Sequence, residues 1–381
     1  MKIRQSIIAF TMLVLAQQSN CQTIDTLLQI GNHKIHFHII KGRGIPVLFE
    51  SGAGDDGSVW QPILKPIADI TEATLITYDR AGFGNSTLDT INTDPSKHGI
   101  ISGLEDLEVG LEKLGYDKKI MLVSHSYGGY FTTLYSNKHP DRVQTIVLID
   151  VMHNFENRYA DQDVKEHEEE TKTLKKSNPG FYYLATNISQ TAKIMSKISI
   201  PKDIPVVDMV DGISFFDDTS MANYWKECHR DFVAEHPKSI SIIASGCGHY
   251  IWNENPGLVV ATIAKSYAET LSDTLKNIVL QRDLNYAILS LCETVQDQHS
   301  ENSLNLWGYD LLARGDSIKA LEIFRLNTSL NPESWNAYDS YGEALLKFNR
   351  KEEAINMYKK SVELNPENEN GQKVLAELLK K

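Results

Sequence analysis

The sequence predicts an α/β protein with a mostly parallel sheet, followed by an all-helical repeat region. Between residues 23 and 151, short apolar segments alternate with segments of helical spacing, which is typical of a parallel sheet covered on both faces. One apolar segment, 120–123, leads through Ser126 into two glycines, the pattern of a sharp turn from a strand into a helix. Near the end of the chain, residues 301–366 repeat at an offset of 34, because Leu-Asn-Pro-Glu begins at 330 and again at 364.

Length and composition place the chain among ordinary globular proteins. It has 381 residues, a length that favours two domains or more. Hydrophobic residues make up 41% and charged residues 23%. The net charge of -12 argues against a nucleic-acid partner and against a basic membrane-binding surface. Beyond Cys21 the three remaining cysteines do not indicate a disulfide framework.

The first 22 residues have the pattern of an export signal. Lys2 and Arg4 precede a short apolar run, 7–16, which is too short to span a bilayer. Polar residues follow up to position 22. We therefore expect a signal peptide at 1–22 and an exported protein, periplasmic or extracellular, with no transmembrane span. Lipidation of Cys21 ranks second, because the residues before it lack the small apolar pair that such a site normally has.

Residues 23–271 are expected to form one domain. The stretch 152–203 interrupts the alternation: it begins polar and then becomes amphipathic, which predicts an inserted helical cap over one edge of the sheet. Strands are expected at 34–40, 46–50, 74–79, 120–123, 145–150, 204–207 and 240–244, and helices at 104–114, 127–139 and 256–271.

Ser126 is the candidate nucleophile. In the pattern G-x-S-x-G, a strand turns so sharply into a helix that the serine hydroxyl stands out at the sheet edge. Here Ser124 replaces the first glycine, and it is the next smallest side chain for a turn that brings backbones close together. Taken alone this pattern is a weak signal, so its weight depends on the other segments that the fold brings to the same edge.

Three further segments follow strands and belong to that edge. The glycine-rich turn 51–54 leaves backbone N–H groups that, with the N–H of Tyr127, suit an oxyanion hole. The turn 79–86 borders the site, and we expect Asp79 and Arg80 to pair with each other. His249 follows the last strand after a glycine, on the side where open α/β sheets place their ligands.

These four motifs, in this order, resemble the α/β-hydrolase family over residues 23–271. The resemblance implies that Ser126 is the nucleophile and that His249 is the general base and later the general acid. It also implies that the amides of Ala53 and Tyr127 form the oxyanion hole. Two positions depart from the family pattern: Ser124, and the opening Glu-Ser-Gly at 50–52 in place of His-Gly. Neither departure removes a reacting group, because the oxyanion donors are backbone amides.

The acid that should orient His249 is open among three residues. Asp150 closes an apolar strand, where a carboxylate is costly without a partner, and it ranks first. A capping role for it, with hydrogen bonds to backbone amides, is the alternative. Asp217 ranks second and Asp211 third, because both follow the strand at 204–209 but lie beyond or short of the family's spacing.

The C-terminal region resembles tetratricopeptide (TPR) repeats, helix-turn-helix units of 34 residues. At this offset Gly308 matches Gly342, and an aromatic residue recurs at 324 and 358. We expect two repeats and a capping helix at 301–381, preceded by a helical linker or degenerate repeat at 272–300. TPR repeats favour a protein partner or docking, without saying which.

The sequence thus predicts an exported serine hydrolase that cleaves an ester, or less readily an amide, through an acyl-enzyme. No cofactor or metal is expected, and His36 and His38 are interpreted as an exposed strand face. One alternative is an aminopeptidase of the proline-iminopeptidase kind, for which Glu168 to Glu170 are the candidates to hold a substrate amine. The other is an inactive hydrolase scaffold that acts through its repeats. A serine at the elbow disfavours epoxide-hydrolase chemistry, which uses a carboxylate nucleophile in this fold.

Overall fold

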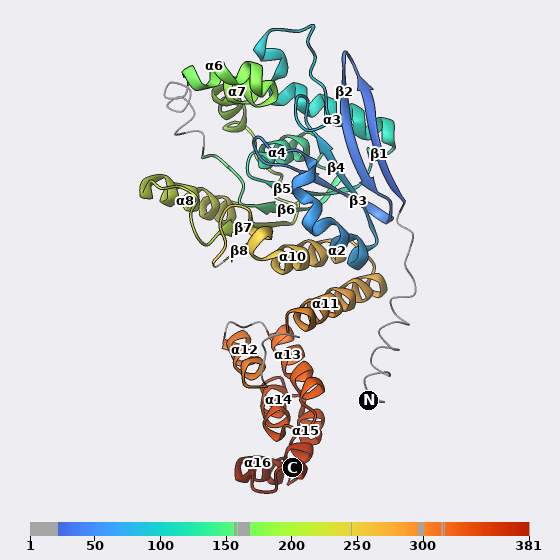
Figure 1. The fold of residues 1–381 in the computed structure, drawn as a ribbon, viewed down its shortest axis with the longest axis vertical. Helices are drawn as coiled ribbons and strands as arrows, with labels where there is room; N and C mark the ends of the chain where they lie inside the picture. Colours follow the sequence, from blue (N-terminus) through green and yellow to red (C-terminus); the bar gives the residue numbers. More distant parts are fainter. Residues whose placement is uncertain are drawn as a thin grey trace. The chain divides into compact units, whose positions relative to one another are not determined.

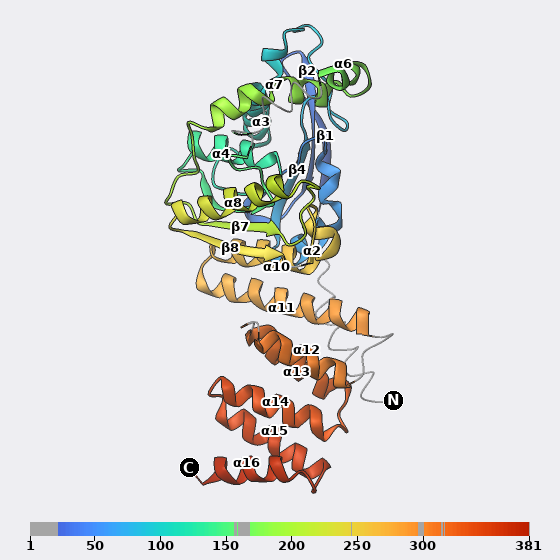
Figure 2. The ribbon, with the colours of Figure 1, turned by 90° about the vertical axis from the view of Figure 1, so that its left-hand side faces the viewer.

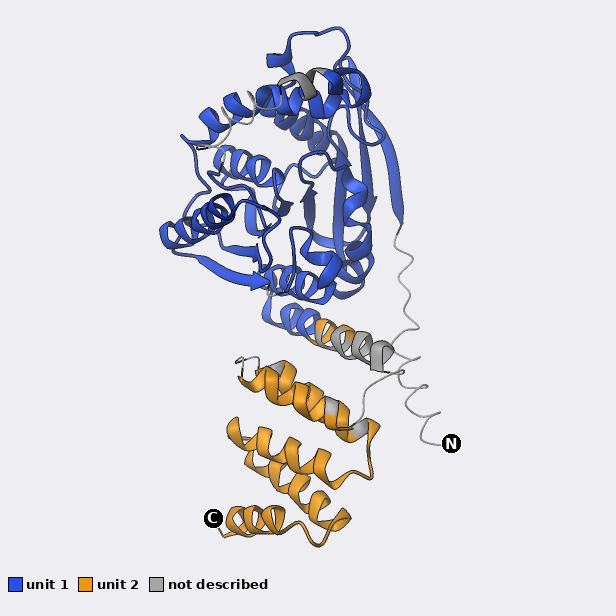
Figure 3. Ribbon diagram, turned by 60° about the vertical axis from the view of Figure 1, so that its left-hand side comes forward, with its two compact units in different colours: residues 1–280 blue, residues 281–381 orange. Residues whose placement is uncertain are grey.

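The chain forms two compact units, which divide between Leu280 and Gln281 inside helix α11 (Asp273–Val295) (Figure 3). The computed structural model describes residues 22–155, 158, 168–244, 246–295, 301–313, 315 and 317–380. The expected signal peptide and Cys21 lie outside the described residues, apart from residue 22. No helix among the described residues combines the length and the apolar character that crossing a membrane requires.

The first unit is built on one eight-stranded sheet (Figure 1). The strand order is β1-β2-β4-β3-β5-β6-β7-β8, in which β1, β2 and β4 pair antiparallel and the remaining neighbours pair parallel. This confirms the expected α/β class with a mostly parallel sheet. The strands are β1 (Thr23–Ile30), β2 (His33–Ile40), β3 (Arg43–Glu50), β4 (Ala73–Asp79), β5 (Ile120–His125), β6 (Val143–Ile149), β7 (Val206–Asp211) and β8 (Ser239–Ala244).

Helices cover both faces of this sheet, which is why its central strands are apolar throughout. Every residue of β4 and β5 is buried, whereas β1 alternates between exposed and half-buried positions. Helix α2 (Gln61–Thr71) packs on α10 (Pro256–Ala268), and α3 (Ile100–Leu114) packs on α4 (Gly128–Lys138) over the opposite face (Figure 2). Short helices lie at η1 (Gly57–Trp60), η2 (Pro95–His98) and α9 (Ile251–Glu254).

Two of the longer elements were not predicted from the sequence. Strand β1 was not expected, although its period-two burial pattern is the usual one for a half-exposed strand. Helix α8 (Thr219–Glu235) was not expected either, because the segment after β7 was interpreted only as a loop. Asp218 caps this helix by accepting a hydrogen bond from Met221 N at 2.9 Å. Helix α8 packs on β7 and β8, and it contributes residues to the candidate site described below.

The expected cap contains two described helices, α6 (Glu168–Ser177) and α7 (Pro179–Met195). Asn178 caps α7 by accepting a hydrogen bond from Phe181 N at 3.1 Å. Helix α7 contacts η2, α3 and α4. Its first turn also approaches the glycine-rich turn after β3, since a Cβ on Gly54 would lie 3.5 Å from the Phe181 ring. The cap helix therefore lies over the edge to which the predicted motifs belong.

The second unit is entirely helical in its described residues. Its core is formed by buried residues of three helices, among them Phe324, Tyr341, Leu345 and Tyr358. Gly308 packs against the ring of Phe324, and Gly342 packs against the ring of Tyr358, so the contact recurs at the expected offset. The assignment to TPR repeats stays a prediction. The helices after α11 are α12 (Glu301–Ala313), α13 (Ser317–Leu330), α14 (Trp335–Lys347), α15 (Lys351–Leu364) and α16 (Glu369–Leu379).

We predict that Gly308→Ala destabilises the second unit. A Cβ at this position would lie 2.6 Å from the nearest ring atom of buried Phe324, so the ring or the helix must shift. This strain opposes the gain of about 1 kcal/mol that alanine brings to a helix, and we expect a net loss of about 1–2 kcal/mol. Urea unfolding followed by circular dichroism measures it. The control is Gly257→Ala in α10, where the nearest atom is 3.8 Å away and the substitution should be neutral or stabilising. Greater stability of Gly308→Ala would contradict the close packing.

Candidate active site

Ser126 lies at the turn between β5 and α4 with a left-handed backbone, φ 50°. For a residue with a side chain this conformation costs about 1–3 kcal/mol, so the surroundings must enforce it. Its carbonyl accepts hydrogen bonds from Gly129 N at 3.0 Å and from Met152 N at 3.2 Å, while its own N–H donates to Ile149 O at 3.3 Å. These bonds tie the turn to the end of β6. The result is the strained strand-to-helix turn that the sequence predicted.

The two glycines after Tyr127 are required by close backbone packing. A Cβ on Gly128 would lie 2.6 Å from Glu50 O, and a Cβ on Gly129 would lie 2.6 Å from Val151 Cβ. The elbow is therefore wedged between the ends of β3 and β6. Ser124, in the position where the family pattern has glycine, is completely buried and pairs with Glu50 and Leu148 on the flanking strands.

The glycine-rich turn after β3 is held by a buried arginine. Arg80, 7% exposed, donates from one terminal nitrogen to Ser51 O at 3.0 Å and from the other to Gly52 O. Its guanidinium also lies 5.6 Å from the ring centroid of Tyr127 and 5.3 Å from that of Phe131. None of the described residues accepts a backbone hydrogen bond from Ala53 N–H. Arg80 thus links the two segments that were predicted to supply the oxyanion donors.

The expected pairing of Asp79 with Arg80 is wrong. Asp79 accepts hydrogen bonds from Gly57 N at 2.9 Å and Asn85 N at 2.7 Å, and it pairs with His36 at 3.0 Å. The two side chains are neighbours where β4 ends, and neighbouring side chains of a strand point to opposite faces. Asp79 therefore organises the turn at 79–86, whereas Arg80 organises the turn at 51–54.

The structure brings Asp150 onto His249. Asp150 Oδ2 lies 2.6 Å from His249 Nδ1, and its other oxygen accepts hydrogen bonds from Trp225 Nε1 at 2.9 Å and Asp211 N at 3.0 Å. The carboxyl group is completely buried, so these partners replace its water. Like Ser126, Asp150 has a left-handed backbone, with φ 47°. Because His249 uses Nδ1 for this bond, Nε2 is the nitrogen left to exchange a proton with a nucleophile.

The other two candidate acids do not contact His249. Asp217 is exposed, immediately before the residue that caps α8. Asp211 is buried and donates its backbone N–H to Asp150, but neither oxygen of its carboxyl group has a hydrogen-bond partner. Burial and the neighbouring charge of Asp150 raise the pKa of Asp211 to about 6. Asp211 is therefore a neighbour of the Asp150–His249 pair rather than its acid.

His125 packs beneath the turn at Ser126. Its Nε2 lies 3.1 Å from His249 O, and its ring lies 4.4 Å from the His249 ring between centroids. Burial lowers the pKa of His125 well below its usual value, so the ring is neutral and its Nε2–H donates to that carbonyl. His125 thereby holds the backbone of His249 in place.

A second group of histidines lies behind Asp150. His153 Nε2 is 2.9 Å from one oxygen of Asp208, and His229 Nδ1 is 2.8 Å from the other. One ligand atom from each of the three residues falls within 4.8 Å of the others, a spacing that a metal ion would fit. However, each carboxylate oxygen is already matched to one imidazole nitrogen, and the second nitrogen of His229 lies 3.8 Å from Asp150 Oδ1. The arrangement is that of a buried hydrogen-bond network rather than of a coordination sphere.

The predicted strand-face pair, His36 and His38, shares one carboxylate. His36 Nε2 lies 2.5 Å from Asp25 Oδ1, and His38 Nδ1 lies 3.2 Å from Asp25 Oδ2. These two histidines are not part of the group that has the spacing of metal ligands among the described residues.

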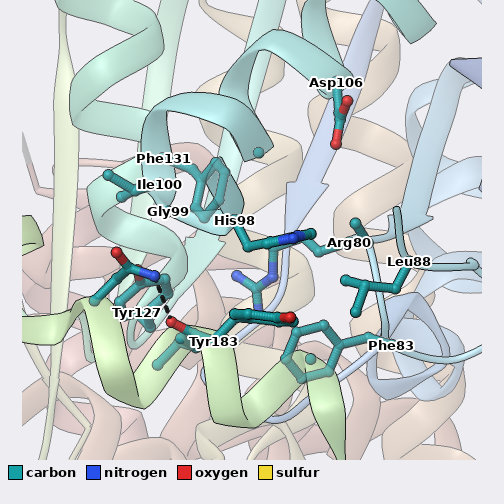
Figure 4. Close-up of a pocket in the computed structure, with 15 residues that line it drawn as sticks. Arg80, Phe83, Leu88, His98, Gly99, Ile100, Asp106, Tyr127, Phe131 and Tyr183 are labelled. Carbon is teal, nitrogen blue, oxygen red and sulfur yellow. Dashed lines mark hydrogen bonds between the residues drawn. The ribbon is translucent and has the colours of Figure 1, made fainter. Parts of the chain in front are cut away.

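A cavity of about 60 Å³ lies under the cap helix α7, beside Tyr127, the residue after the candidate nucleophile (Figure 4). Arg80 and Tyr127 line it from the sheet side, and Tyr183 and Asn187 line it from α7. His98 stacks on Tyr183 with 4.0 Å between the ring centroids. Ser126 and His249 are not among the lining residues, so this cavity adjoins the predicted reaction centre rather than containing it. Its small size and largely apolar lining suit a compact apolar group.

Several residues of the site were not singled out by the sequence. Trp225 and His229 belong to α8, a helix that the sequence did not predict. Asp208 lies inside β7, and the sequence indicated no role for it beyond that strand. A polar residue in the middle of an apolar strand was the one available signal, because it requires a partner. The side chains of Glu168 to Glu170, the candidates for holding a substrate amine, lie outside the described residues.

Comparison with known proteins agrees with this architecture. Residues 45–184 match the family model described as alpha/beta hydrolase fold. A (lyso)-N-acylphosphatidylethanolamine lipase of Bos taurus is 36% identical over 110 residues, which are 28% of this chain and 30% of the lipase. A putative carbamate hydrolase, RutD, of Caulobacter vibrioides is 28% identical over 127 residues, 33% of this chain and 43% of that protein. The matches thus span less than half of these relatives.

The similarity in three dimensions extends further along the chain. The structure of a mutant epoxide hydrolase from Vigna radiata superposes with a TM-score of 0.51 at 15% identity, covering 65% of this chain and 99% of the other. Identity this low concerns the fold alone. Together with the strand order and the turn at Ser126, these matches show that the first unit of this chain has the alpha/beta hydrolase fold.

Proposed function

We propose that the first unit is a serine hydrolase that cleaves an ester, or less readily an amide, with Ser126, His249 and Asp150 as its catalytic triad. The observation that carries the proposal is the 2.6 Å bond between Asp150 Oδ2 and His249 Nδ1, beside a strained turn that presents Ser126. An aspartate in this position fixes the tautomer of the histidine and stabilises its cation during reaction. The (lyso)-N-acylphosphatidylethanolamine lipase among the relatives adds support for an ester substrate.

In the proposed reaction, Ser126 Oγ attacks the substrate carbonyl carbon while His249 Nε2 takes the hydroxyl proton. The negative charge that develops on the carbonyl oxygen is met by the N–H groups of Ala53 and Tyr127. His249 then gives its proton to the leaving alcohol or amine, and an acyl-enzyme remains on Ser126. A water molecule, deprotonated by His249, attacks the acyl-enzyme, releases the acid and restores the hydroxyl. The residues that carry these steps need no cofactor.

We further propose that the protein is exported and that its second unit consists of TPR repeats that bind a protein partner or dock. The export proposal rests on the charged and apolar pattern of residues 1–22. The repeat proposal is supported by the contacts of Gly308 with Phe324 and of Gly342 with Tyr358, at the offset of 34 residues. An inactive scaffold is disfavoured, because the buried Asp150 is matched to His249 and the turn at Ser126 keeps its strain.

The first prediction tests the nucleophile. A fluorophosphonate should label the folded protein at Ser126, because a triad activates a serine hydroxyl that is otherwise unreactive. Mass spectrometry of the labelled peptide locates the adduct, and Ser126→Ala should abolish it. Hydrolysis of p-nitrophenyl esters of graded acyl length, compared with prolyl anilides, then separates an esterase from an aminopeptidase. A folded protein that takes up no label at Ser126 would refute the enzyme proposal.

The second prediction separates the candidate acids. Asp150→Asn should lower kcat by about 10³–10⁴-fold with little change in KM, because the neutral amide no longer holds the reactive tautomer of His249. Asp217→Asn is the matched control and should keep kcat within about twofold, as expected for an exposed surface substitution. Equal losses in the two variants, or a larger loss in Asp217→Asn, would refute the choice of Asp150.

The third prediction concerns the oxyanion turn. Arg80→Lys should lower kcat by about 10–100-fold, because a single ammonium cannot hold the carbonyls of both Ser51 and Gly52 as the guanidinium does. KM should change little, since the lost interaction supports the transition state. Arg43→Lys, at an exposed strand end, is the control. Unchanged kcat in a folded Arg80→Lys variant would show that the turn holds its shape without this residue.

A further inference from the structure

A row of titratable side chains continues from His249 into the interior of the first unit. One oxygen of Asp150 contacts His249, and His229 approaches the other. Asp208 lies between two rings, with one oxygen on His229 and the other on His153. Asp150, Asp208 and His229 are each 2% exposed or less. The reaction proposed above uses only His249 and Asp150. It gives no role to His229, Asp208 or His153.

The contacts of His229 place a proton on Nδ1 and favour a protonated ring. Its Nδ1 lies 2.8 Å from Asp208 Oδ2, and an ionised carboxylate can only accept, so Nδ1 carries a proton. Its Nε2 lies 3.8 Å from Asp150 Oδ1, and no hydrogen-bond partner reaches it. In a neutral ring this nitrogen would turn its lone pair toward a carboxylate oxygen. A protonated ring places an N–H there instead, and the contact becomes attractive.

The electrostatics of the cluster agree with that assignment. Burial opposes the charge on His229, but Asp208 and Asp150 outweigh it and raise the pKa of the ring above its ordinary value. Burial likewise opposes the charge on Asp208, and His229 and His153 hold the pKa of that carboxyl well below its usual range. Burial lowers the pKa of His153, so this ring serves as a neutral donor. The electrostatics therefore favour a cation at His229, between two carboxylates.

We propose that Asp208 and His229 form a positioning pair that keeps Asp150 ionised and sets the pH at which the Asp150–His249 pair takes up a proton. The proposal rests on the proposed function only in treating Asp150 and His249 as catalytic. The paired charges themselves follow from the contacts within the row. A general base must be neutral to accept a proton, so the pair would determine how far activity extends toward acid pH.

The direction in which the acid limb of kcat/KM should shift follows from how close His229 and Asp208 lie to Asp150. His229 Nε2 lies 3.8 Å from Asp150 Oδ1, whereas His249 contacts Oδ2, and Asp208 lies on the far side of the His229 ring. Removing the cation makes the Asp150–His249 pair bind its proton more tightly, so the acid limb of kcat/KM should move to higher pH. Among the described residues, the groups that act on His229 are Asp150 and His153 after β6 and Asp208 and Asp211 of β7. Lys226 of α8 and His249 after β8 act in turn on Asp211.

The central variant is His229→Gln. An amide keeps a hydrogen-bond donor near Asp150 but removes the charge, and the acid limb should move up by about one pH unit. Asp208→Asn should move the limb in the same direction by less, because His229 then loses the carboxylate that keeps it protonated. Asp211→Asn should move the limb the opposite way only where Asp211 is ionised, above its pKa of about 6, because there it removes an anion beside Asp150. His236→Gln, on the same stretch of chain but outside the row, is the control and should leave the limb in place.

A readout independent of turnover distinguishes this inference from the proposed function. NMR of ¹⁵N-labelled histidine should show His229 protonated throughout the acid limb in the wild-type protein, and His249 titrating at higher pH in Asp208→Asn. These shifts without fluorophosphonate labelling would support the pair while refuting the hydrolase. A neutral His229 at pH 7 would overturn the proposal, even if His229→Gln does not fold. So would an acid limb that Asp208→Asn leaves unmoved, or a stoichiometric metal ion whose chelation produces the same shift.

Discussion

The first unit depends on keeping one buried carboxylate, Asp150, satisfied at the end of β6. Removing one partner from a buried charged group costs about 3–5 kcal/mol, so each of its contacts constrains a different part of the chain. Trp225 brings α8 to the sheet, Asp211 N joins the end of β7, and His249 ties down the loop after β8. Asp150 both stabilises the packing of α8, β7 and the loop after β8 and orients the candidate base. A substitution of Asp150 should therefore affect folding stability as well as activity.

The neighbouring turn at Ser126 is subject to a second constraint of the same kind. Its left-handed backbone is maintained by bonds from Gly129 and Met152 and by glycines that allow the ends of β3 and β6 to close on it. Arg80 packs against Tyr127 in the elbow and holds the turn at 51–54 by donating hydrogen bonds to two of its carbonyl groups. The candidate nucleophile, oxyanion donors and acid are thus positioned by the backbone ends of adjacent strands. The cap helix α7 adds the small cavity beside them.

Residues with a local signature were predictable. Ser126 and the glycine turn at 51–54 lie in short patterns in which backbone geometry restricts the residue type, and His249 follows a glycine after a recognisable strand. The class of the sheet was also predictable, because strands buried on both faces must be apolar throughout, as β5 is. The pairing of Asp79 with Arg80 failed, because neighbours in sequence at a strand end face opposite sides, and each found partners far along the chain.

The sequence by itself determined the fold class of the first unit, the place of the candidate nucleophile and base, and the helical nature of the second unit. Each of these follows from the spacing of residues that are close together in the sequence. It left the acid open among Asp150, Asp217 and Asp211, because a carboxylate acquires its role from residues that only folding brings near. The tertiary structure placed Asp150 on His249 and left Asp217 in solvent. It also assembled Asp208, His229 and His153 behind them, a charge network drawn from a strand, a helix and the segment after β6 that no local pattern connects.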